Sequence, residues 1–184
     1  MLPLPTTTIA YGEHGDDPVA CVLRDRARLQ EIADLALTSR GVDAILRATA
    51  QEAAEQLGMP MALVTVVLDD AQHFAAMHGV EGWMARTRGT PVEWSFCRYA
   101  VAWREAFVVE DAAVHPLVQD SPLVEHDGVR SYAGHPLVTS AGHAVGTLCV
   151  LGTDPRTFSD ADLATLRDFA ERAVRRIEAR RGEG

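Results

Sequence analysis

The stretch VRSYAGHPLVTSAGHAVGTLCVL, residues 129–151, decides the fold of this chain. It contains two apolar runs, residues 129–138 and 143–151, separated by the turn sequence TSAG, which is typical of an antiparallel hairpin. Pro136 suits a strand end or edge, and Gly146 suits a place where another backbone approaches closely. The stretch therefore predicts two long strands that close a mostly antiparallel sheet.

Further strands are predicted upstream of this hairpin. Residues 61–68 read MALVTVVL, a β-branched apolar run typical of a buried strand, and residues 72–80 return as its hairpin partner after a turn of two aspartates. Residues 107–111, FVVED, predict a short strand. Residues 80–128 otherwise indicate short helices and loops that cross one face of the sheet, an excursion of the kind that encloses a pocket.

Helical periodicity precedes the first strand. From Asp17 the apolar residues fall on one face, so an amphipathic helix is predicted that ends near Arg40. A second helix is predicted from Asp43, a suitable N-cap, to Leu57, after which glycine and proline stop it. Two helices are therefore expected before the sheet begins.

The last predicted helix has a clear start at Ser159, whose hydroxyl can cap it while Asp162 supplies a carboxylate in the first turn. Apolar residues then recur at spacings of three and four, namely Leu163, Leu166, Ala170, Ala173 and Ile177. Such a stripe suits docking on the chain's own sheet and dimerisation equally well. Both interpretations stay open.

Composition narrows the class of protein. A net charge of -9 argues against nucleic acid as a partner, and the absence of lysine excludes Schiff-base chemistry. Three cysteines far apart, Cys21, Cys97 and Cys149, predict a reducing compartment and hence a cytoplasmic location. No apolar run is long enough for a membrane span. The 184 residues suit a flexible N-terminal arm, 1–16, and a single domain, 17–181.

The expected fold class is α+β: a central antiparallel sheet with helices from both termini on one face and the excursion over the other. The segments SFCRYAV, FVVEDAAVHPLV and GVRSYAGHPLVTSAGHAVGTLCVLGTDPRTF, with the helix that follows, resemble a GAF domain, a PAS-related sensing module of signalling proteins. The resemblance covers about Arg28 to Arg176. It implies a small-molecule ligand between sheet and excursion, and a signal passed through the terminal helices of a homodimer to a downstream signalling protein.

Aromatic residues concentrate around Cys97, although aromatics make up only 6% of the chain. Phe96, Ala100 and Trp103 form an ordinary core stripe on a helix after Ser95, which leaves Trp94 and Tyr99 off the stripe. The candidate ligand-binding residues are Trp94, Ser95, Cys97, Tyr99, Asp111, His115 and Tyr132. The aromatic members would form walls, and Ser95, Asp111 and His115 would be polar anchors. Core packing alone explains the cluster equally well.

An alternative function rests on Cys97 as a reactive thiol, either in a redox sensor or in an enzyme like free methionine sulfoxide reductase, which also has the GAF fold. A position in the first turn of a helix beside Arg98 favours a thiolate. A small buried apolar residue is the competing interpretation. The reductase cycle needs a second thiol, but residues 115–128 contain no cysteine, and Cys149 lies inside a predicted strand.

Other chemistry has little support in the sequence. Asp111 with His115, and His126 with Asp127, do not form a metal-ligand spacing with a specific signal. No catalytic triad or phosphate-binding glycine loop occurs, so the sequence favours a protein that is not an enzyme over an enzyme, and it leaves the identity of any cofactor unknown. A third interpretation, a partner module with an empty pocket, also remains.

Overall fold

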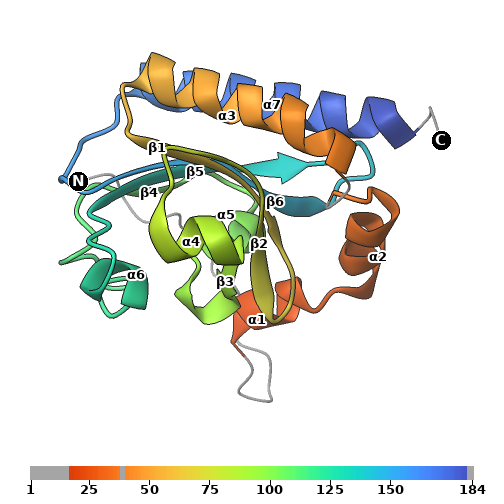
Figure 1. Cartoon of the computed structure of the whole chain (residues 1–184). Helices are drawn as coiled ribbons and strands as arrows, with labels where there is room; N and C mark the ends of the chain where they lie inside the picture. The colour runs from red at the N-terminus through yellow and green to blue at the C-terminus, as the bar shows by residue number, and fades with distance from the viewer. Residues whose placement is uncertain (1–16, 38–39, 182–184) are drawn as a thin grey trace.

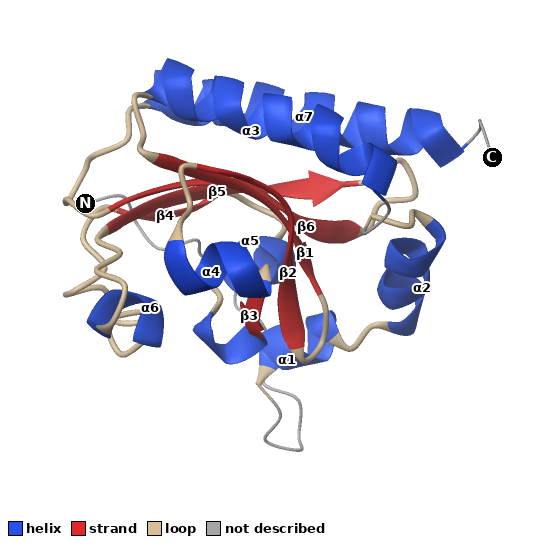
Figure 2. Ribbon diagram, viewed as in Figure 1, coloured by secondary structure: helices blue, strands red, loops and turns tan. Residues whose placement is uncertain are grey.

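The computed structural model describes residues 17–37 and 40–181 (Figures 1 and 2). Its helices are α1 (Pro18–Leu23), α2 (Arg26–Asp34), α3 (Arg40–Leu57), α4 (Gly82–Thr87), η1 (Val92–Trp94), α5 (Cys97–Trp103), α6 (Pro122–Glu125) and α7 (Asp160–Arg181). Its strands are β1 (Met61–Val67), β2 (Ala71–His78), β3 (Gly89–Pro91), β4 (Phe107–Val109), β5 (Ser131–Val138) and β6 (Ala144–Gly152). The predicted α+β class is confirmed. The predicted arm, 1–16, lies outside the described residues.

A six-stranded antiparallel sheet of order β3-β2-β1-β6-β5-β4 forms the centre of the fold. The N-terminal hairpin and the C-terminal hairpin meet where β1 pairs with β6, in a register that runs from Met61 opposite Leu151 to Val66 opposite Gly146. Every residue of β6 is buried. Because both faces of these central strands are covered, their sequences read as nearly continuous apolar runs.

Helices α3 and α7 pack side by side along one face of the sheet (Figure 1). Ala62, Val64 and Val66 of β1 point into this layer, while Leu63 and Val67 point into the opposite layer, which contains α1 and α5. The apolar stripe of α7 is largely buried in the same layer: Leu166, Ala170, Ala173 and Ile177. The interpretation that α7 docks on its own sheet is therefore confirmed.

The helices before the sheet differ from the prediction. The single helix predicted from Asp17 is divided into α1 and α2, because the Asp25 side chain accepts a hydrogen bond from the backbone of Arg28 and caps a new helix. Arg28 is buried although it is charged, and it donates to the carbonyls of Val67 and Leu23. Helix α3 begins at Arg40, so the prediction of Asp43 as its N-cap was wrong.

Two details of the sheet bear on the sequence analysis. β3 was not predicted, because three residues that include a proline carry no strand signal. Pro136 lies near the end of β5, opposite Thr147 of β6 and beyond Gly134, where the described pairing with β4 ends. Within residues 17–37 and 40–181, no helix has the length and apolar character needed to cross a membrane.

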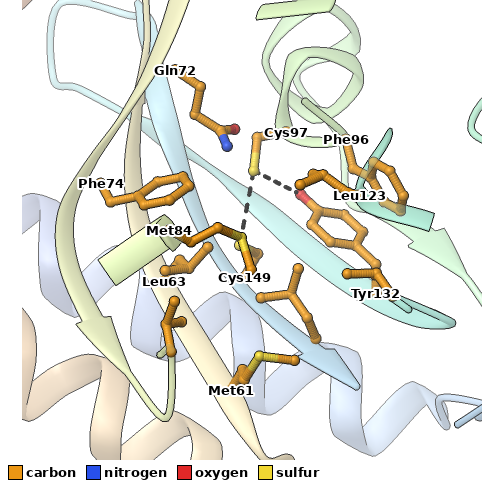
Figure 3. Close-up of a pocket in the computed structure, with 13 residues that line it drawn as sticks. Met61, Leu63, Gln72, Phe74, Met84, Phe96, Cys97, Leu123, Tyr132 and Cys149 are labelled. Atoms are coloured by element: carbon orange, nitrogen blue, oxygen red, sulfur yellow. Dashed lines mark hydrogen bonds between the residues drawn. The ribbon is translucent and has the colours of Figure 1, made fainter. Parts of the chain in front are cut away.

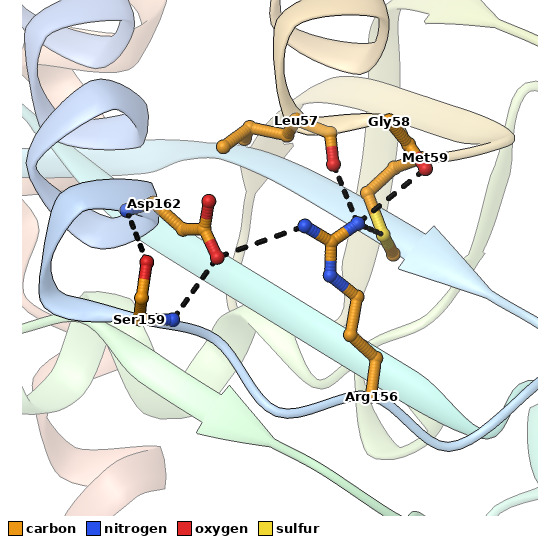
Figure 4. A network of polar contacts seen from close by, with 6 residues as sticks. All are labelled: Leu57, Gly58, Met59, Arg156, Ser159 and Asp162. Carbon is orange, nitrogen blue, oxygen red and sulfur yellow. Dashed lines mark hydrogen bonds and ion pairs between the residues drawn. The ribbon is translucent and has the colours of Figure 1, made fainter.

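The segment before α7 ties the two long helices together (Figure 4). Ser159 and Asp162 exchange backbone and side-chain hydrogen bonds of 3.0 and 3.1 Å, which confirms the predicted start of α7. Arg156 Nη1 donates to the carbonyl of Leu57 at the end of α3, and its Nη2 lies 3.6 Å from Asp162 Oδ2. Arg156 therefore links the C-terminus of α3 to the N-terminus of α7.

The β1–β6 pairing makes a prediction for Gly146, where an added Cβ would lie 1.8 Å from the carbonyl oxygen of Thr65 on β1. Gly146→Ala should lower the free energy of unfolding by about 3 kcal/mol, because the central strands must separate to admit the methyl group. Gly142→Ala in the same hairpin meets no atom within 4 Å and carries only the strain of φ +86°, so it should cost about 1 kcal/mol. Equal losses in urea unfolding would contradict the close approach.

Candidate functional site

A small chamber lies between the sheet and the excursion (Figure 3). It leaves about 20 Å³ for the centres of water-sized molecules, which is room for about one such molecule. The sheet contributes Met61, Leu63, Gln72, Phe74, Tyr132, Cys149 and Leu151, and the covering segments contribute Val80, Met84, Phe96, Cys97, Leu123 and Val129. The predicted hollow over the sheet is present, and it is nearly filled by its own side chains.

The chamber wall is apolar except for a few uncharged groups. Its lining contains no acidic or basic residue and no histidine; the polar lining residues are Gln72, Tyr132 and the two cysteines. Buried Ser95 donates its hydroxyl proton to Oε1 of Gln72 and so holds the amide in place. The chamber therefore suits an uncharged molecule and offers no cationic partner to a buried anion.

Two thiols meet at this wall. The Sγ atoms of Cys97, at the start of α5, and Cys149, on β6, lie 3.8 Å apart, and the Tyr132 hydroxyl donates to Cys97 Sγ at 3.3 Å (Figure 3). Tyr132 reaches this position because its ring lies over Gly134, where an added Cβ would be 2.0 Å from the phenol oxygen. The expectation that Cys149 is out of reach because it lies in a strand is corrected by this contact.

The environment makes the two thiols unequal. Burial is the largest influence on Cys97 and raises its pKa, but side-chain hydrogen bonds outweigh it and lower the pKa to about 6. Those bonds come from Cys149, Thr147, Tyr132 and Thr65. Burial and the contact with Cys97 raise the pKa of Cys149 well above its ordinary value, so the pair loses its first proton at Cys97. Burial likewise raises the pKa of Tyr132, which keeps the phenol proton available for donation.

The structure distributes the predicted ligand-binding residues over several places. Cys97 and Tyr132 line the chamber, and Ser95 contacts it through Gln72. Trp94 lies behind the wall, edge-on to Trp83 with ring centroids 6.1 Å apart. The remaining predicted residues, Tyr99, Asp111 and His115, do not line the chamber.

Tyr99 and His115 belong to a neighbouring aromatic cluster around Phe107, whose ring centroid lies 5.0 Å from that of Tyr99 and 5.5 Å from that of His115. Phe107 also contacts Tyr132 of the chamber, with ring centroids 5.9 Å apart. Burial lowers the pKa of His115. Asp111 forms a bidentate ion pair with Arg130 at 2.8 and 2.9 Å. This hydrogen bonding lowers the pKa of Asp111. In the part of the chain that the structure describes, no group of three or more metal-binding side chains is close enough to hold an ion.

The cover of the chamber belongs mostly to the predicted excursion, and two parts of it lie beside the contribution of α5. Val80 and Met84 come from α4 and the turn before it, and Leu123 comes from α6. A hydrogen bond of 2.7 Å from Trp83 Nε1 to Asp127 Oδ1 joins the two segments. Trp83 and Asp127 thus form a latch across the chamber. Trp83 and Asp127 are far apart in the sequence, and no sequence motif predicts that their side chains form a hydrogen bond.

Comparison with known proteins agrees with this geometry. The family model of the GAF domain matches residues 41–177. A cyclic di-GMP phosphodiesterase of Pseudomonas aeruginosa is 32% identical over 159 residues, which are 85% of this chain and 26% of that protein. The chain therefore spans about a quarter of the length of this curated relative.

Solved structures show the same fold. The GAF domain of a phosphoenolpyruvate-protein phosphotransferase from Coxiella burnetii is 16% identical with a TM-score of 0.66, over 91% of this chain and 96% of that one. Free methionine-R-sulfoxide reductase from Neisseria meningitidis, solved with its substrate, is 23% identical with a TM-score of 0.63, over 95% of this chain and 99% of that one. At these identities the likeness concerns the fold alone.

The contact between Tyr132 and Cys97 makes a prediction for the pKa of the thiol. The Tyr132 hydroxyl stabilises the thiolate form of Cys97 through a hydrogen bond and so lowers the pKa of this thiol. Tyr132→Phe removes the hydrogen bond, so the pKa of Cys97 should rise by about one unit. Thiolate absorbance at 240 nm, followed as the pH is raised, should appear at higher pH in the variant. Tyr99→Phe is the matched control, because its hydroxyl donates to the carbonyl of Leu117 instead. Identical titration curves for Tyr132→Phe and the unchanged protein would contradict the assignment.

Proposed function

Because the chain belongs to the GAF domain family, we propose that it is a sensory domain in signal transduction and that the chamber takes up its signal molecule. The observation that carries this proposal is the enclosed apolar wall, built from both the sheet and the excursion, with an oriented amide and a phenol among its few polar groups. An apolar pocket with a small number of placed polar groups is the usual composition of a small-ligand site.

The wall indicates the class of ligand. An anion would lose its hydration and meet no cationic side chain, only the Cys97 thiolate of like charge, which is strongly unfavourable in an apolar chamber. We therefore expect a small uncharged molecule with an apolar body and one hydrogen-bonding end, placed to meet Gln72. The same consideration bears on the reductase alternative, because a free amino acid carries a carboxylate for which the lining offers no cationic partner.

Uptake of anything larger than about one water-sized molecule needs the cover to move. The latch between Trp83 and Asp127 is the contact that holds α4 against the loop after α6. Gly79 and Gly82, both with positive φ, flank the two residues that lead into α4. Release of the latch would let Met84 and Val80 swing away from the sheet and widen the chamber.

The output would travel through the sheet. β1 and β6 carry chamber residues on one face and contacts to α3 and α7 on the other, so a displacement of these strands reaches both helices. For a ligand to transmit a signal, it must bind one helix arrangement more tightly than the other. We propose that two copies associate and pass this change to a downstream signalling protein in the cytoplasm.

The surface of the layer formed by α3 and α7 limits the kind of contact through which such a homodimer could form. The apolar stripe of α7 is buried in the protein's own core and does not face a second copy. An ion pair of 2.9 Å between Arg172 and Glu52 connects the outer sides of α7 and α3. A dimer through this layer would therefore be largely polar. The match to a quarter of a cyclic di-GMP phosphodiesterase supports a regulatory role beside a signalling enzyme.

The proposal predicts selective effects of a small uncharged probe on the methionine methyl groups. Protein labelled with 13C at the methionine methyls should show shifts at Met61 and Met84 when phenol is added, since both side chains line the chamber. Met59 is the internal control, because it is buried in the helical layer on the opposite face of the sheet. Benzoate, the charged analogue, should leave all three signals in place at the same concentration and neutral pH.

Trp83→Phe removes the latch donor and keeps an aromatic ring, so it should allow phenol to act at lower concentration. The experiment is run with reductant present, so that thiol chemistry does not contribute. Equal shifts of the methyl groups of Met59, Met61 and Met84, or no shift at millimolar phenol in either protein, would sink the proposal of a ligand chamber.

A further inference from the structure

We propose that Cys97 and Cys149 form a redox-active dithiol that hydrogen peroxide oxidises to an intramolecular disulfide. The pair goes beyond the sensing role, because its oxidation needs no bound ligand and uses only groups at the chamber wall. Both thiols are free and buried, and their sulfur atoms lie 3.8 Å apart. Disulfide formation brings the sulfurs to about 2.05 Å, so α5 and β6 must approach each other by less than about 2 Å.

The surroundings of the pair favour a thiolate at Cys97. The Tyr132 hydroxyl donates to its sulfur at 3.3 Å, and the Cys149 sulfur lies 3.8 Å away. Thr65 and Thr147 are fully buried and hold each other through a hydrogen bond of 3.0 Å between their Oγ atoms. Buried polar groups in an apolar layer are costly unless they are paired, and here the threonines pair with each other while Tyr132 pairs with Cys97.

The chamber provides the place for the oxidant. Cys97, Cys149 and Tyr132 all line it, and its free space holds about one water-sized molecule. Hydrogen peroxide is uncharged and only slightly larger than water, so its charge and its size both suit the chamber. Larger organic peroxides would need the cover to open first.

The reaction balances in two steps. The Cys97 thiolate attacks one oxygen of hydrogen peroxide, the O–O bond breaks, and Cys97 becomes a sulfenic acid while the other oxygen leaves as water after taking up a proton. The Cys149 sulfur then attacks the Cys97 sulfur, the S–O bond breaks, and the second oxygen leaves as water with the thiol proton. Two thiols thus lose two electrons and two protons, and one peroxide yields two waters.

The oxidised form would differ in the position of α5. β6 is paired with strands on both sides, whereas α5 is one short helix at the start of which Cys97 lies. Closure of the disulfide would therefore draw α5 toward the sheet and reduce the chamber. α1 packs on α5, so it would follow this movement.

Mass spectrometry of the full chain tests the dithiol directly. Reduced protein treated with stoichiometric hydrogen peroxide should lose about 2 Da per monomer, and peptide mapping should find the link between Cys97 and Cys149. Cys21→Ser removes the exposed thiol and should change neither the mass loss nor the link. Cys149→Ser should stop at a sulfenic acid on Cys97 that dimedone traps. Cys97→Ser should form no internal link.

A rate measurement separates an activated pair from mere proximity. If Tyr132→Phe raises the pKa of Cys97 from about 6 by about one unit, the thiolate fraction at pH 6 and the initial rate of oxidation should both fall about fivefold. The link in the product should stay the same. A native protein that keeps both buried thiols under peroxide, or that links Cys21 instead, would overturn the proposal; because this readout uses the unchanged chain, it holds even if a cysteine variant fails to fold.

Discussion

The antiparallel pairing of β1 with β6 is the constraint on which the rest of the structure depends. It joins two hairpins that are far apart in the chain, and it places Gly146 so close to β1 that no side chain fits between them. Because both faces of the pair are buried, one face can anchor the helices α3 and α7 while the other forms the floor of the chamber. A displacement of β1 or β6 at the chamber therefore acts directly on α3 and α7, which pack on the other face of the same strands.

The parts of the fold that sequence could predict are those with local causes. The hairpin of residues 129–151 carries its own turn and close-approach glycine, and the start of α7 carries a reciprocal cap at Ser159. The division between α1 and α2 depends on Asp25 capping a second helix inside an apolar pattern that continues across the break. Arg28 is buried because three backbone carbonyls, two of them distant in sequence, accept from its guanidinium, and periodicity cannot reveal such partners.

The candidate site shows the same limit. Cys97 and Tyr132 were predicted from residue type and lie together at the chamber, whereas the importance of Cys149 was missed. Its strand position in fact favours the contact, since alternation puts Cys149 on the face opposite Leu148 and Val150, but only the fold shows that this face receives α5. Aromatic composition likewise did not distinguish the chamber from the neighbouring cluster around Phe107, because both use the same residue types.

The central claim is that the β1–β6 floor and its cover enclose a space that admits small uncharged molecules. Diffraction from crystals equilibrated with xenon gas tests it most directly, because xenon is uncharged, needs no hydrogen bond and is visible as a single heavy atom. The account predicts xenon between Leu63, Met61 and Met84, inside the chamber. Xenon found only on the surface or within the helical layer, with the chamber unchanged, would contradict it.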